Sequence, residues 1–281
     1  FIADIRRLRE KADAGAPVPA AYARRATGIL LDADSIQAIG LNRQTTEWNT
    51  ESHVLKYYRA LKSFGAPVDF VRRGADLARY PVLVVPAHQM IDEELIAALT
   101  RYAEQGGMLL LTCRTGLHDR RGHLWEAKFY EPMWKLVGAE IESYDLPMPH
   151  APNTVRFGSE DFEWSSWGDL LKPRPGTATW ATHQGDFYAG TPAVVSRKLG
   201  KGTVTWVGVD TRSGQLEKQV LARLFAERGI AVEGYPEGVL VEYRDGLGIA
   251  LNYSDKDFVM PLPAGTEILV GDTTLETASV L

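Results

Sequence analysis

The chain has 281 residues, of which 45% are hydrophobic and 24% charged, and this composition excludes a disordered, collagen-like or low-complexity protein. Its 31 basic and 36 acidic residues give a net charge of −5, so no nucleic-acid partner is expected. One cysteine excludes an internal disulfide and a cysteine-rich zinc site, which favours a reducing, cytoplasmic location. No apolar run approaches the roughly 20 residues of a membrane span, so no membrane partner is expected.

Residues 1–25 are predicted to be a linker. Phe1, Ile5 and Leu8 form one narrow helical stripe, and two prolines follow in an alanine-rich stretch. A lone amphipathic helix has little to pack against within such a segment. We therefore expect its partner surface to lie upstream of this chain.

Residues 26–232 alternate between strand and helix patterns. Continuous apolar runs predict buried strands, and apolar residues at helical spacing predict helices between them. The expected strands are 28–31, 68–71, 80–85 and 108–112, and the expected helices are 54–64, 95–102, 125–137 and 216–225. This order predicts an α/β fold with a doubly wound parallel sheet.

Two segments depart from that alternation. Residues 144–176 are rich in Pro, Trp, Ser and Asp and predict long loops or short irregular strands. Residues 193–198 and 204–209 predict a hairpin across Gly200-Lys-Gly202. Residues 233–281 then predict short, closely spaced strands at 239–243, 248–252, 258–260 and 267–270, which indicate a small antiparallel β domain.

Asp32 and Asp34 follow a predicted strand, as the paired carboxylates of haloacid-dehalogenase phosphatases do. That reading needs a late acidic pair for magnesium, and Asp210 offers only one carboxylate. The favoured interpretation is that Asp32 and Asp34 are loop and helix-cap residues.

Cys113 follows a buried strand, where class I glutamine amidotransferases carry their nucleophile. Their tight turn needs small residues two positions to either side, and here these are Leu111 and Thr115. The partner His-x-Glu is also missing at His183. A packed, inert thiol is therefore expected, and an enzyme using Cys113 is the alternative.

The remaining polar motifs predict no cofactor and no metal. The six histidines lack metal-binding spacing and are interpreted as surface or loop residues: His53, His88, His118, His123, His150 and His183. Gly200-Lys-Gly202 lies between two strands rather than before a helix, so it is interpreted as a turn and not as a phosphate loop.

Tryptophans supply the interface candidates. Four lie in periodic elements and are expected in the core: Trp125, Trp134, Trp180 and Trp206. Trp48, Trp164 and Trp167 lie in polar stretches, where exposed indoles would form an interface or a sugar-stacking surface. Partial burial against their own domain is nevertheless the more common case for such residues.

The order of motifs resembles one family. The motifs in chain order are Gly28-Ile-Leu-Leu-Asp32, Tyr57-Tyr58 with Leu61, Asp76-Leu77 with Tyr80, Gly106-Gly107 through Thr112 to Arg114, Leu199-Gly-Lys-Gly202 and Leu251-Asn252-Tyr253-Ser254-Asp255. Together they resemble the second and third domains of glycoside hydrolase family 42 β-galactosidases, over nearly the whole chain from Thr27.

The resemblance implies a homotrimer and a separate role for each of three segments. Residues 1–25 would be the linker helix from the catalytic barrel, 26–232 a flavodoxin-like trimerisation domain related to class I glutamine amidotransferases, and 233–281 a small β-sandwich. The family's catalytic glutamates lie on barrel strands, so the resemblance assigns no catalytic residue here. It implies that a β-galactoside substrate is met only through the barrel, with Trp48, Trp164 and Trp167 at a subunit interface or an active-site entrance.

Overall fold

Strands that are apolar on both faces form the centre of the structure, a computed structural model that describes residues 2–126, 128–148 and 153–277. The helices are α1 (Ile2–Lys11), α2 (Ala20–Ala23), α3 (Ala33–Leu41), α4 (Thr50–Ser63), α5 (Glu93–Glu104), α6 (Glu131–Val137) and α7 (Gln215–Glu227), with a 3₁₀ turn at Leu77–Arg79. The strands of the large sheet are β1 (Thr27–Leu30), β2 (Val68–Val71), β3 (Val82–Val85), β4 (Met108–Thr112), β5 (Ala139–Asp145), β6 (Asn153–Phe157), β7 (Glu160–Pro173), β8 (Thr177–His183), β9 (Pro192–Leu199), β10 (Gly202–Val207) and β11 (Val209–Thr211).

The large sheet is half parallel and half antiparallel. Strands β2, β1, β3, β4 and β10 lie side by side in that order and are parallel. From β9 onward the neighbours are antiparallel, in the order β9, β8, β6, β7 and β11, and β5 pairs with the free part of β7. The predicted α/β class is confirmed. The predicted parallel arrangement holds for five strands, and hairpin-linked antiparallel strands, of which β9 and β10 were expected, extend the sheet.

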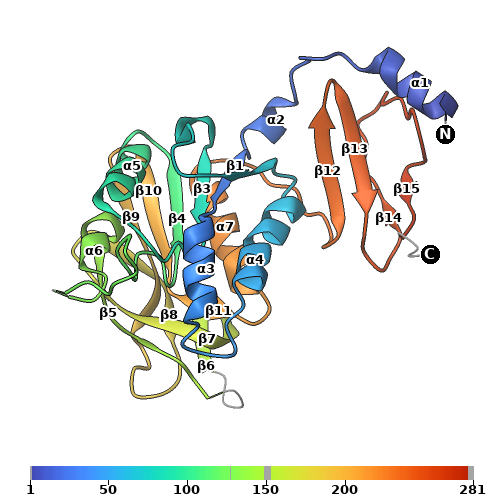
Figure 1. Cartoon of the computed structure of the whole chain (residues 1–281). Coiled ribbons are helices and arrows are strands. Elements are labelled where there is room, and N and C mark those ends of the chain that lie inside the picture. Colours follow the sequence, from blue (N-terminus) through green and yellow to red (C-terminus); the bar gives the residue numbers. More distant parts are fainter. Residues whose placement is uncertain (1, 127, 149–152, 278–281) are drawn as a thin grey trace.

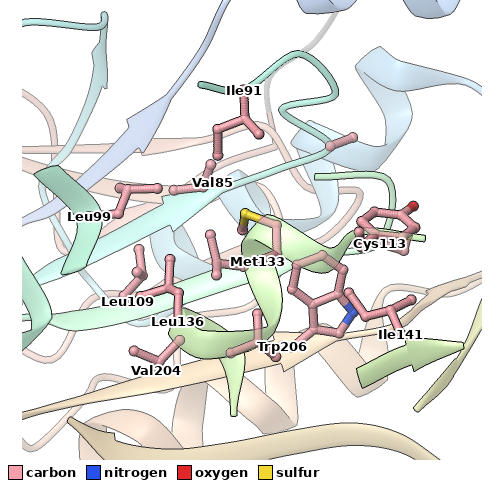
Figure 2. Packing of buried hydrophobic residues seen from close by; sticks show 14 of the residues in the cluster. Val85, Ile91, Leu99, Leu109, Cys113, Met133, Leu136, Ile141, Val204 and Trp206 are labelled. Carbon is pink, nitrogen blue, oxygen red and sulfur yellow. The ribbon is translucent and has the colours of Figure 1, made fainter. Parts of the chain in front are cut away.

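Helices cover both faces of the sheet (Figure 1). Side chains of α5 and α6 pack on one face against residues such as Leu83 and Val85, and Figure 2 shows part of this cluster. Side chains of α4 and α7 pack on the other face against the alternate residues Val82 and Val84. This alternation explains why the strand reads as a continuous apolar run.

Residues 144–176, predicted to be long loops or short irregular strands, include one short strand, β6, and one long strand, β7, so the prediction is wrong for β7. Strand β7 is fourteen residues long and pairs with β5, β6 and β11. Its Ser and Trp side chains are buried because neighbouring strands cover them, and only tertiary pairing supplies that cover. The helix expected at 125–137 was also too long, since α6 begins only at Glu131.

A smaller unit follows α7 and stands beside the main body (Figure 1). It contains two antiparallel pairs, β12 (Val239–Arg244) with β13 (Leu247–Asn252) and β14 (Phe258–Val259) with β15 (Thr274–Leu275). Small antiparallel sheets were expected here, but the strand predicted at 267–270 is irregular. Glu242 of β12 accepts hydrogen bonds from Lys62 of α4 and Tyr22 of α2, which joins the two units.

Candidate functional site

The carboxyl ends of the parallel strands are the first place to look for a site, because ligands of open α/β sheets bind there. Strand β4 ends in Thr112, and Cys113 and Arg114 follow it. All three side chains are fully buried. The edge of the sheet therefore holds a closed cluster of polar side chains rather than an open cleft at these residues.

Cys113 is a packed thiol, as predicted. It belongs to the same cluster as Leu109, Met133 and Trp206 (Figure 2) and is 0% exposed. Burial raises the pKa of this thiol well above its ordinary value, and the charges of Asp169 and Asp210 act in the same direction. A nucleophilic cysteine needs the thiolate, so this environment opposes catalysis.

A hydrogen-bonded chain beside it has the order of a hydrolase triad. His53 Nε2 lies 2.9 Å from Thr112 Oγ1, and His53 Nδ1 lies 2.7 Å from Asp210 Oδ1. Burial opposes ionisation of Asp210, but the hydrogen bond and charge of His53, with Lys56, outweigh it and hold the pKa of that carboxyl well below its usual range. The geometry of nucleophile, base and acid is thus present.

This series of hydrogen bonds from Thr112 through His53 to Asp210 is nevertheless structural, because no substrate can reach the Thr112 hydroxyl. Thr112 and His53 are 0% exposed, and Thr112 Oγ1 already accepts the N–H of Ala87 at 2.8 Å. Ser166 Oγ and Lys56 Nζ each lie 2.6 Å from an oxygen of Asp210, which completes its bonding. The network ties α4 to β4, β7 and β11.

Arg114, the residue after Cys113, has an unusual backbone conformation and an unusual environment. Its backbone φ is +68°, and its guanidinium lies between the rings of Trp48 and Trp167, at 4.7 and 4.5 Å from the centroids. It donates to the carbonyl oxygen of Arg43 at 2.9 Å and to the side-chain oxygen of Gln44. Burial lowers its pKa below the ordinary value. Arg114 thereby fastens the loop between α3 and α4 to the sheet.

Trp48, Trp164 and Trp167 are not exposed loop residues, and that part of the prediction is wrong. Their exposed fractions are 2%, 0% and 0%. Trp164 and Trp167 lie on β7, and Trp48 precedes α4 and packs edge-on against Trp167 with ring centroids 6.4 Å apart. The polar residues around them led to the wrong expectation, because those residues line strand edges and caps instead of a free loop.

The interpretation of the histidines as surface or loop residues is wrong for His53, which lies on α4, and for His183, which lies on β8; His88 and His118 lie in loops, as interpreted. His53, His88, His118 and His183 are buried, and only His123 is exposed among those described. His150 lies outside the described residues. His53 and Lys56 are three residues apart on α4, and both contact Asp210. This helical spacing was the only feature of the sequence that could have indicated a shared role for the two side chains.

Asp32 is a helix cap, as interpreted from the sequence. Its Oδ2 accepts the Ser35 N–H at 2.9 Å and the Ser35 hydroxyl at 2.7 Å, at the start of α3. Arg120 pairs with Asp32 at 3.4 Å and with Asp34 at 3.0 Å. Within the described ranges no group of three His, Cys, Asp or Glu residues could hold a metal ion. Gly200 lies in the turn between β9 and β10 and has a φ of +58°.

Comparison with known proteins decides the family. Residues 25–231 match the family described as the β-galactosidase trimerisation domain. The chain belongs to that family. The resemblance to glycoside hydrolase family 42, first indicated by the order of the motifs, is confirmed.

Relatives of this trimerisation-domain chain are β-galactosidases. One from Haloferax lucentense is 30% identical over 249 residues, which make up 88% of this chain and 37% of the relative. One from a Geobacillus strain is 29% identical over 213 residues, 74% of this chain and 31% of the relative. The solved β-galactosidase of Halorubrum lacusprofundi superposes with a TM-score of 0.82 at 27% identity, covering 94% of this chain and 38% of that one. The chain thus spans about a third of the length of these relatives.

In the residues that the structure describes, no helix is both long and apolar enough to cross a bilayer.

Proposed function

We propose that this chain is the non-catalytic self-association region of a β-galactosidase that hydrolyses terminal β-D-galactosides. The observation that carries the proposal is the match of residues 25–231 to the β-galactosidase trimerisation domain. The named relatives support the parent activity, since the chain aligns with about a third of each. The proposed assembly is a homotrimer, in which a patch on one copy meets a different patch on the next.

The buried polar edge supports a non-catalytic role. A retaining glycosidase needs two carboxyl groups about 5–5.5 Å apart on either side of the sugar bond. Here the carboxyl groups of Asp169 and Glu217 are fully buried and that of Asp210 nearly so, and each is hydrogen-bonded within the fold. We therefore place the catalytic pair, and contact with the galactoside, in a barrel outside the described structure.

The proposal includes the finer fold and domain assignments. The parallel strands have the order β2-β1-β3-β4-β10, which corresponds to the 2-1-3-4-5 order of flavodoxin-like sheets. We propose a linker at 1–25, an amidotransferase-like trimerisation domain at 26–232 and a small β-sandwich domain at 233–281. A single buried, unpaired cysteine supports a cytoplasmic location.

We propose only an indirect role at a subunit interface or active-site entrance for Trp48, Trp164 and Trp167. Because their side chains are buried, they can serve a subunit interface or an active-site entrance only by holding the backbone around them. Replacement of Trp164 and Trp167 by alanine in the full enzyme tests this role. Unchanged assembly and unchanged substrate affinity in a folded variant would refute this role of the tryptophans.

The first experiment is the solution mass of the chain by size-exclusion chromatography with light scattering. Three copies of the 31.1 kDa chain would give about 93 kDa, which is the expected result. A monomer at 31.1 kDa would refute self-association of this region by itself. Galactoside titration of such a monomer would test the remaining alternative, a sugar-binding module.

An enzyme that uses Cys113 is the other candidate function. It predicts rapid, stoichiometric alkylation of the folded chain, whereas the buried thiol predicts none before unfolding.

A further inference from the structure

The carboxyl group of Asp169 is buried among neutral donors. It is 0% exposed and lies on β7, the neighbour of the edge strand β11. Trp167 Nε1–H donates to Oδ1 at 2.8 Å, and Trp206 Nε1–H donates to Oδ2 at 3.0 Å. Each oxygen thus accepts one indole hydrogen bond, an arrangement that fits the ionised form. Burial without a contacting cation works against that same form.

The nearest positive charge is committed elsewhere. Arg114 attracts Asp169 electrostatically, but its N–H groups donate to Arg43, Gln44 and Gln89, and its plane stacks between two indoles. Arg114 is therefore held by the loop before α4 and by the tryptophans. Asp169 supplies charge to it only at a distance. We call Asp169, Arg114, Trp48, Trp167 and Trp206 the Asp169 cluster.

Burial shifts the pKa of three titratable groups near this carboxyl away from neutral pH. Burial raises the pKa of the Cys113 thiol and of the Tyr130 phenol well above their ordinary values. His183 Nε2 lies 3.2 Å from the backbone oxygen of Asp169, and burial lowers the pKa of this ring. Burial raises the pKa of Asp169 itself to about 7, against the two indole donors and the charge of Arg114.

We infer that the Asp169 cluster is a pH-sensitive switch, in which one proton on Asp169 weakens an indole hydrogen bond and removes the counter-charge of Arg114. The protonated oxygen has given up one lone pair and its negative charge, so it is a weaker acceptor for its indole N–H than the ionised oxygen. Arg114 holds the backbone oxygen of Arg43 and the side chain of Gln44. Acidification therefore acts on the loop that leads from α3 to α4, and this inference is independent of the proposed self-association.

The test follows the indole N–H groups directly. The full chain has seven tryptophans, so ¹⁵N-tryptophan labelling gives seven indole cross-peaks, assigned with Trp167→Phe and Trp206→Phe. Between pH 5.5 and 8.5 we expect the peaks of Trp167 and Trp206 to shift together with one midpoint near 7. The peak of Trp48, which donates to Thr50 and stacks on Arg114, should follow the same titration.

Two variants make the outcome decisive. Asp169→Asn should abolish the titration, whereas Asp161→Asn, an exposed carboxylate on the same strand, should leave it unchanged. Trp206→Phe removes a donor that stabilises the ionised form and should raise the midpoint seen at Trp167 by about one pH unit. Indole peaks that do not titrate, or a Trp206→Phe midpoint equal to that of the wild type, would overturn the inference even if Asp169→Asn failed to fold.

Discussion

Asp169→Asn should change how the free energy of unfolding depends on pH. Burial raises the pKa of Asp169 from 3.8 to about 7 in the folded chain. The folded state therefore binds a proton that the unfolded state has released across this interval. The stabilisation from this group is complete below pH 3.8 and is lost as the pH rises through about 7. Asparagine does not titrate, so the variant lacks this pH-dependent contribution to the free energy of unfolding.

The magnitude follows from the width of the interval. One pKa unit corresponds to about 1.4 kcal/mol, so lowering the pH from 8 to 5 should favour the wild type over the variant by about 2.7 kcal/mol. The side chain is fully buried, so solvent screening does not reduce this figure.

Urea unfolding of both proteins at pH 5, 6, 7 and 8 and at one protein concentration measures the difference. The unfolding midpoints and m values give the free energy of unfolding at each pH. Asp161→Asn is the matched control, because its carboxylate pairs with Arg156 at the surface. A difference between wild type and Asp169→Asn that stays constant with pH would refute the reasoning.

Three further outcomes follow from the described contacts. His53→Ala leaves the Asp210 carboxylate without one partner and should cost about 3–5 kcal/mol in urea unfolding; a cost below about 1 kcal/mol would show that the network is dispensable. Cys113 should react with a thiol reagent only at the rate of unfolding, and a fast reaction in buffer would contradict its burial. Gly202→Ala should destabilise the chain by about 1–3 kcal/mol, because a Cβ there would lie 2.2 Å from a backbone oxygen. Gly40→Ala, on an open face of α3, should instead stabilise the chain by about 0.5–1 kcal/mol. Equal effects of the two substitutions on the free energy of unfolding would refute the inference that only Gly202 lacks room for a Cβ.

Local patterns predicted much of the main body. The apolar run of β3 and the spacing of α5 follow from burial on one or two faces, which neighbours in the chain already specify. The cap at Asp32 depends on contacts within three residues, so its role could be predicted. The order of these local elements also sufficed to identify the family.

Only the tertiary structure decided the polar interior. His53, Ser166 and Asp210 are far apart in the sequence, and nothing local to any one of them indicates that they share hydrogen bonds. Strand β7 carries Trp164 and Trp167 among Ser, Glu and Asp, a composition typical of a loop. Those side chains are buried because β5, β6 and β11 pair with β7, and strand pairing between distant segments leaves no periodic trace in the segment that it covers.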